Sequence, residues 1–206
     1  LHQLMQKSVQ ARKNRIISTK SGQFQSGLPI FKTNRNTNRS LRRYSRMETW
    51  DAYDKDFNKV HNATLIRGEA IPEGLFHLVC DIIVKHTDGS YLLMQRDRCK
   101  QFGGMWEATA GGSALQNESP LDCAIRELQE ETGIRTDNLV EVGRERSNDT
   151  IYVEFLCVTN CNKDCITLQD GETIAYKWVS RSELVSLKKS ELVTERMQKF
   201  IEELQL

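Results

Sequence analysis

The pattern of apolar and polar positions after residue 46 predicts strands interleaved with helices. Five short segments have the apolar or partly alternating character of β-strands, and the first of them is also rich in β-branched residues. They are His77–Lys85, Tyr91–Gln95, Leu139–Arg144, Ile151–Val158 and Thr173–Val179. The pair Asp88-Gly89 separates the first two segments and predicts a β-hairpin.

Apolar residues at helical spacing mark three further segments. Ser190–Leu204 repeats them three and four positions apart, in a stripe that predicts packing against a core. A shorter helix is predicted at Ser182–Leu187 and a third at residues 120–132. Strands mixed with helices in this order indicate an α/β (α+β) fold with a mixed sheet flanked by helices.

The segment 120–132 has residues typical of both ends of a helix. Ser119 is a favourable N-cap, Pro120 suits the first helical position, and Gly133 is a typical C-terminal cap. Asp122 favours the positive end of the helix dipole. The apolar face consists of Leu121, Ala124, Ile125 and Leu128.

Charge divides the chain after residue 46. Residues 1–46 hold 11 of the 29 basic residues and no acid, which leaves 18 basic and 28 acidic residues in 47–206, a formal charge of −10. Four interpretations of the basic segment stay open: a tail that contacts nucleic acid or anionic lipid, an organelle transit peptide, non-native upstream or cloning sequence, and an ordered extra layer. We expect a disordered or non-native segment at 1–46 and a domain at 47–206.

Cysteine usage and hydropathy predict a cytoplasmic protein that does not enter a membrane. The six cysteines include no C-x-x-C pair, and Cys157, Cys161 and Cys165 have no fourth ligand nearby. Free thiols in a reducing compartment are therefore expected, rather than zinc ligands or disulfides. The longest apolar run, Leu78–Val84, is interrupted by Asp81 and is too short to span a bilayer.

Three acids crowd the last two turns of the helix at 120–132. Glu127 lies one turn from both Glu130 and Glu131. Only one basic residue, Arg126, has a spacing that pairs it with one of them. Acids near the negative end of a helix lower its stability, whereas a bound Mg²⁺ removes the repulsion because hard cations prefer carboxylate oxygens.

The stretch from Gly111 to Ile134 resembles the Nudix box, G-x5-E-x7-R-E-U-x-E-E-x-G-U, in which U is a bulky aliphatic residue. Every defined position is filled, by Gly112, Glu118, Arg126, Glu127, Leu128, Glu130, Glu131, Gly133 and Ile134. The resemblance covers residues 47–206 and implies a Nudix-type α/β/α sandwich with its catalytic loop and helix at 111–133. It also implies hydrolysis of a diphosphate bond that links a nucleoside to another moiety in a small molecule.

Mg²⁺, or Mn²⁺ in its place, is the cofactor that this resemblance implies. The metal ligands would be Glu127, Glu130 and Glu131, assisted by the carbonyl of Gly111. Within the box, Glu130, Glu131 and Arg126 are the expected catalytic residues. A metal ion held there would neutralise the diphosphate and acidify or position an attacking water.

A catalytic base is expected outside the box. Glu172, which precedes the last predicted strand, is the first candidate, and Glu154 on the strand Ile151–Val158 is its rival. Gly112 and Arg96 are expected to bind substrate, because glycine admits a phosphate closely and arginine can pair with it. Lys100 is a further candidate for contact with phosphate.

Two alternatives come from other function classes. Residues 48–54 and 66–69 resemble a Nudix branch related to isopentenyl diphosphate isomerase, which implies isomerisation of a small allylic diphosphate. The cysteine and histidine of that enzyme correspond to Gly111 and Ser113, so this chain lacks the proton-transferring thiol. The second alternative is a non-catalytic Nudix-fold regulator, although no box glutamate is missing. Nucleic acid is not an expected partner, and a homodimer is left open.

Overall fold

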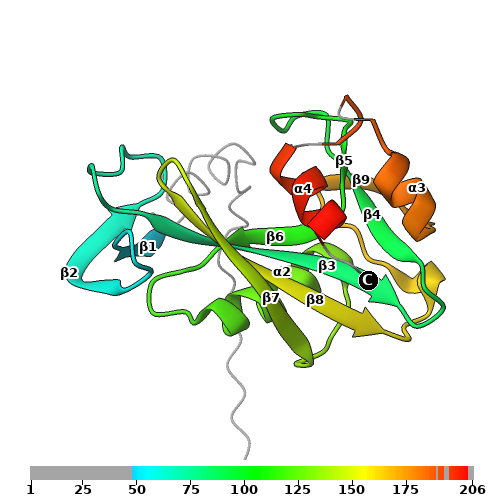
Figure 1. Ribbon diagram of the computed structural model, residues 1–206, viewed down its shortest axis with the longest axis horizontal. Helices are drawn as coiled ribbons and strands as arrows, with labels where there is room; N and C mark the ends of the chain where they lie inside the picture. The colour runs from blue at the N-terminus through cyan, green and yellow to red at the C-terminus, as the bar shows by residue number, and fades with distance from the viewer. Residues whose placement is uncertain (1–47, 189, 193–194, 204–206) are drawn as a thin grey trace, which may run out of the picture. The chain divides into compact units, whose positions relative to one another are not determined.

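A seven-stranded mixed sheet forms the centre of this computed structural model (Figure 1). The structure describes residues 48–188, 190–192 and 195–203, so the predicted basic segment 1–46 lies outside the described residues. The strands are β3 (His77–His86), β4 (Tyr91–Arg96), β5 (Trp106–Glu107), β6 (Thr109–Ser113), β7 (Leu139–Ser147), β8 (Thr150–Thr159) and β9 (Thr173–Val179).

The strand β3 organises the sheet because it pairs on both edges. Along one edge it runs parallel to β8 over its whole length. Along the other edge, Val79–Ile83 pairs antiparallel with β6. The same edge meets β4 only at the predicted hairpin, where Lys85 faces Tyr91, and β4 in turn carries β5 and β9. The mixed sheet confirms the predicted fold class.

Helices cover both faces of this sheet (Figure 1). They are α2 (Pro120–Thr132), α3 (Arg181–Ser186) and α4 (Glu195–Glu203). Cys123 and Leu128 of α2 share a core with Cys80 of β3, whereas Phe200 of α4 shares a second core with Ile83. Even and odd residues of β3 therefore face different layers, as the period of two in a strand requires. None of the described helices has the length and apolar character needed to cross a bilayer.

The caps predicted for α2 are present. The Ser119 Oγ accepts a hydrogen bond from Asp122 N at 3.1 Å. Gly133 ends the helix with φ 75°, a left-handed conformation that suits glycine. Because both caps are in place, both ends of α2 are fixed. The positions of its acidic side chains relative to the sheet are therefore fixed too.

A separate two-stranded sheet precedes the main one. Its strands, β1 (Thr49–Tyr53) and β2 (Lys59–Ile66), enclose a small core that includes Trp50 and Leu65. An isolated hairpin of this size is marginally stable. Tyr53 and Phe76 exchange two backbone hydrogen bonds of 2.9 Å, which join the hairpin to the main body.

Three local predictions differ from the structure. The helix predicted over Ser190–Leu204 begins at Glu195, because Leu192 forms a β-bridge with Trp106 instead. Val193 and Leu204 of the predicted stripe lie outside the described residues. The hydrophobic pattern did not predict β1, β2, β5 or β6. The Gly111-Gly112 pair lies within β6 rather than in a loop before the helix.

Candidate active site

A cleft of about 330 Å³ lies where β6, α2, the β1–β2 hairpin and two loops meet. Its lining residues are Glu48, Arg67, Arg96, Lys100, Gly111, Gly112, Ser113, Arg126, Glu127, Glu130, Glu131, Gln169 and Glu172. Every residue predicted to bind metal or substrate is among them. The base candidate Glu172 also lines the cleft, whereas its rival Glu154 does not.

Two glycines of β6 allow a close approach that side chains would prevent. A Cβ at Gly111 would overlap the carbonyl oxygen of Cys80 on β3. A Cβ at Gly112 would lie 2.6 Å from Cδ of Glu127. Neither glycine has a positive φ, so these positions require space rather than an unusual backbone conformation. As a result, β6 passes directly beside the Glu127 carboxylate.

Arg126 connects the acids of α2 to the loop before the helix. Its Nε and Nη2 donate to the two carboxylate oxygens of Glu118, each at 2.8 Å. Its Nη1 donates to Glu127 Oε1 at 2.6 Å and to Glu130 Oε2 at 3.3 Å. These contacts raise the pKa of Arg126, with the Glu118 hydrogen bonds as the largest cause. A permanently charged guanidinium therefore fixes Glu127 against the cleft wall.

Glu131 enters the cleft from the last turn of α2. Its Oε2 accepts a hydrogen bond from Gly111 N at 3.1 Å. Desolvation raises the pKa of Glu131 to about 8, although the Gly111 hydrogen bond opposes the shift. The negative charges of Glu107, Glu127 and Glu172 raise this pKa further. Such a carboxyl has little stabilisation as an anion unless a positive charge is nearby.

The donor types in the cleft fit a hard divalent cation, but their present placement does not converge. Carboxylate and backbone carbonyl oxygens are the ligands that Mg²⁺ prefers. Within residues 48–188, 190–192 and 195–203, no three His, Cys, Asp or Glu side chains lie close enough together to hold a metal ion. The contacts explain this, because Glu127 and Glu130 are bonded to Arg126 while Glu131 turns to Gly111.

Two further cations of the cleft are paired with acids. Arg96 donates to Glu107 of β5 through Nη1, and Lys100 forms an ion pair with Glu172. A backbone hydrogen bond of 2.8 Å from Asp97 N to the Glu172 carbonyl joins the two loops that carry Lys100 and Glu172. The structure thus places both predicted phosphate-binding cations on the same side of the cleft as the base candidate.

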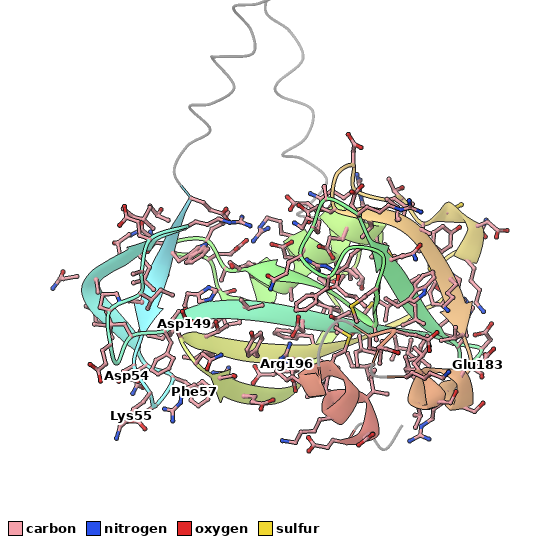
Figure 2. All side chains as sticks on the ribbon, turned by 90° about the horizontal axis from the view of Figure 1, so that it is seen from above. Asp54, Lys55, Phe57, Asp149, Glu183 and Arg196 are labelled. Carbon is pink, nitrogen blue, oxygen red and sulfur yellow. The ribbon has the colours of Figure 1, made fainter. Side chains whose placement is uncertain are left out.

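The rival base candidate Glu154 lies beneath α4. Its Oε1 accepts a hydrogen bond from Arg196 at 2.9 Å, and Arg196 also pairs with Asp81 of β3. Figure 2 labels Arg196 on α4. Burial raises the pKa of Glu154 to about 6, while Arg196 opposes that shift. Glu154 lines a different cavity, of about 240 Å³, between β7 and α4. Its contacts are therefore with a structural ion cluster rather than with the acids of α2.

The hairpin was not among the predicted parts of this site. Glu48 and Arg67 line the cleft from the open end of the β1–β2 pair, next to the paired residues Thr49 and Ile66. Glu48 and Arg67 have opposite charges and lie across from each other at the ends of two paired strands. Such a cross-strand charge pair can be recognised once the strands are known. The strands themselves were missed, so this arrangement was not visible from the sequence.

Comparison with known proteins finds one family. The sequence model of the NUDIX domain matches residues 75–204, which include the cleft residues of β6 and α2. An uncharacterized Nudix hydrolase of Listeria monocytogenes is 28% identical over 151 residues, which cover 70% of this chain and 86% of that protein.

Solved structures share the fold at low sequence identity. The structure of DR0079 from Deinococcus radiodurans has a TM-score of 0.65 at 12% identity and covers 77% of this chain and 100% of that one. The NUDIX domain of Shewanella oneidensis NrtR, solved with ADP ribose, has a TM-score of 0.51 at 17% identity. That match covers 62% of this chain and 84% of the other.

Proposed function

Because this chain belongs to the Nudix hydrolase family, whose enzymes cleave pyrophosphate bonds, we propose that it hydrolyses the diphosphate bond between a nucleoside and another moiety. The observation that carries this proposal is the gathering of Glu127, Glu130, Glu131 and Gly111 in one cleft. A volume of about 330 Å³ suits a small molecule.

The proposed cofactor is Mg²⁺, with Mn²⁺ able to replace it. Glu127, Glu130 and Glu131 would hold the cation together with the Gly111 carbonyl. When bound, the cation would neutralise diphosphate charge and acidify a water molecule. The oxygen donors support this assignment, and the desolvated Glu131 carboxyl gains a positive partner from it.

The remaining residues of the cleft would orient the diphosphate. Arg96 and Lys100 would exchange their present carboxylate partners for phosphate oxygens, to which cationic side chains bind strongly. Gly112 lets the Glu127 carboxylate lie against β6, and a phosphate would approach the Gly112 backbone, which no side chain shields. Arg126 would act as a positioning residue, because its guanidinium is already engaged by Glu118 and Glu127.

Glu172 is the proposed general base. It lines the same cleft as Glu131, and its charge acts on the Glu131 pKa. Transfer of Lys100 to a phosphate would release the Glu172 carboxylate to take a proton from the attacking water. Glu154 is the weaker choice because its carboxylate binds Arg196 and because it lines the other cavity.

The isomerase alternative gains no support from β6. Even the Cβ of a cysteine at Gly111 would overlap the Cys80 carbonyl oxygen, so the backbone present here does not admit that thiol. A regulator without catalysis also gains no support, since each box glutamate is retained. Hydrolysis is the function that the cleft supports best.

The proposed location is the cytoplasm. All six cysteines are free thiols, including the buried Cys80, Cys123 and Cys157. Free thiols are typical of reducing compartments, where disulfides are rare.

A panel of nucleoside diphosphate derivatives tests the function directly. ADP ribose should be included, because the Shewanella domain was solved with it. Each compound is incubated with the full chain and Mg²⁺ or Mn²⁺, and nucleotide and phosphate release are measured. Metal-dependent release from at least one compound is expected, while no release from any of them would contradict the proposal.

Substitution of the proposed metal ligands tests the site. Glu130→Gln and Glu131→Gln should each lower metal-dependent turnover by about 100-fold or more, a common loss when a charge-stabilising group is removed. The exposed Glu73 lies outside the cleft, so Glu73→Gln should retain wild-type turnover and serves as the control. Near-normal turnover in both cleft variants would show that the metal assignment is wrong.

A further inference from the structure

One wall of the cleft comes from outside the NUDIX-domain match. Glu48 and Arg67 line the cleft, yet both precede residue 75, where the match begins. They stand together at one end of the β1–β2 hairpin, where Arg67 N donates to the Glu48 carbonyl at 2.9 Å. The Arg67 guanidinium also pairs with the Glu48 carboxylate, and its side chain is 61% exposed.

The hairpin is fastened to the loop that leads into α2. Gln116 N donates to the Thr49 carbonyl at 2.8 Å, and Asn117 N donates to Asp51 Oδ2 at 2.8 Å. The next residue is Glu118, whose carboxylate binds the guanidinium of Arg126 beside the acids of α2. The hairpin and α2 are therefore positioned by the same short loop.

Acids on two other walls of the cleft also act on Arg67 through their charges. Its pKa is raised, first by the hydrogen bond to Glu48 and then by the charges of Glu48, Glu172 and Glu127. Glu127 belongs to α2, and Glu172 belongs to the loop before β9. Arg67 lines the same cleft as these two acids, in which a diphosphate would lie.

Building on the proposed function, we infer that Arg67 binds the second phosphoryl group of the diphosphate while Arg96 and Lys100 bind the first. An arginine fork matches two phosphate oxygens, and an exposed arginine can leave a carboxylate for a phosphate at little desolvation cost. Arg67 would thereby make binding depend on two linked phosphoryl groups rather than one. This assigns substrate recognition to the hairpin.

Inorganic pyrophosphate and orthophosphate, each with Mg²⁺, are the probes for this inference. Calorimetric titration of the full chain should show that Arg67→Ala weakens pyrophosphate binding by about 10-fold or more, as expected for loss of a charged hydrogen bond. Orthophosphate binding should not change. Arg67→Lys keeps the charge without the fork and should bind pyrophosphate with intermediate affinity. The exposed Arg181 lies outside the cleft, so Arg181→Ala should match the wild type.

Three results would overturn the inference. They are wild-type pyrophosphate affinity in Arg67→Ala, an equal loss of affinity for both probes, and a wild-type chain that does not bind pyrophosphate. Hydrolysis is measured separately on the same proteins. Pyrophosphate binding that depends on Arg67, without turnover of any nucleoside derivative, would contradict the proposed function alone.

Discussion

Arg126 and Arg144 each hold a glutamate through two hydrogen bonds, but their surroundings differ. Arg126 holds Glu118 at 2.8 Å through both bonds, and its Nη1 also holds Glu127. Arg144 holds Glu141 at 2.6 and 3.0 Å on the exposed face of β7. Exposed pairs contribute about 0–1 kcal/mol to stability. Only the first pair also sets the position of an acid in the cleft.

Lysine substitution at these two arginines separates the roles. Arg126→Lys should lower turnover by about 10-fold or more, because lysine lacks the fork and loosens a supporting contact of the proposed metal ligands. Arg144→Lys is the matched control and should leave turnover unchanged. Steady-state kinetics on the substrate found in the panel would measure both effects. Equal turnover in the two variants would contradict a positioning role for Arg126.

The site residues differ in how far the sequence could predict them. Glu127, Glu130 and Glu131 were predicted because their spacing along one helix is a local property. The space required at Gly111 and Gly112 depends on Cys80 and Glu127, which approach from other elements. No local pattern contains that information, and the pair was therefore interpreted as part of a loop.

At the scale of elements, α2 depends on its N-cap to hold the acids in place. Ser119 Oγ accepts the Asp122 N–H at 3.1 Å, which satisfies one of the unpaired donors at the helix start. The same end of α2 adjoins the loop that holds the hairpin. Loss of this cap would weaken the helix and its connection to the hairpin together.

Ser119→Ala should lower the free energy of unfolding by about 1 kcal/mol, the usual cost of losing an N-cap. Ser119→Thr retains the capping oxygen and is the control, with a smaller loss expected. Urea unfolding followed by circular dichroism measures the difference. If both variants unfold at the same denaturant concentration as the wild type, the cap does not contribute to stability.

The elements that sequence analysis missed share a physical cause. β2 has mostly exposed or half-buried positions, so it lacks the apolar alternation of a half-buried strand. β6 contains two glycines, which are depleted in strands. Both strands owe their form to pairing partners, β1 and β3 respectively. By contrast, the apolar runs of β3 and β8 are visible from the sequence itself.

At the scale of the whole domain, a buried ion cluster ties α4 to the sheet. Arg196 of α4 forms ion pairs with both Asp81 of β3 and Glu154 of β8. Glu145 and Glu203 also raise the pKa of Glu154 by their charges, after desolvation and Asp81. The cluster therefore contains more negative groups than positive ones. Protonation of Glu154 reduces the repulsion among these negative groups.

Glu154 should make stability depend on pH. Its pKa rises from 4.5 to about 6 on folding, so its favourable contribution is complete below the lower value and is lost as pH rises through the higher one. Between these limits the wild type should lose about 2 kcal/mol relative to Glu154→Gln. Urea unfolding across this pH range measures the change. The exposed Glu202 provides a control, because Glu202→Gln should follow the wild type. Parallel curves for wild type and Glu154→Gln would contradict the prediction.

The pairing of β3 with β8 also determines when the centre of the sheet can form during synthesis. His77 and Thr150, which face each other at the start of these strands, are 73 positions apart in the chain. Strand pairs of such long sequence separation form slowly, because a long loop must close first. Gly111, Arg126 and Glu131 are all translated within that interval. The acids of α2 are therefore synthesised before β8, so this helix is made before the central strand pair of the sheet can form.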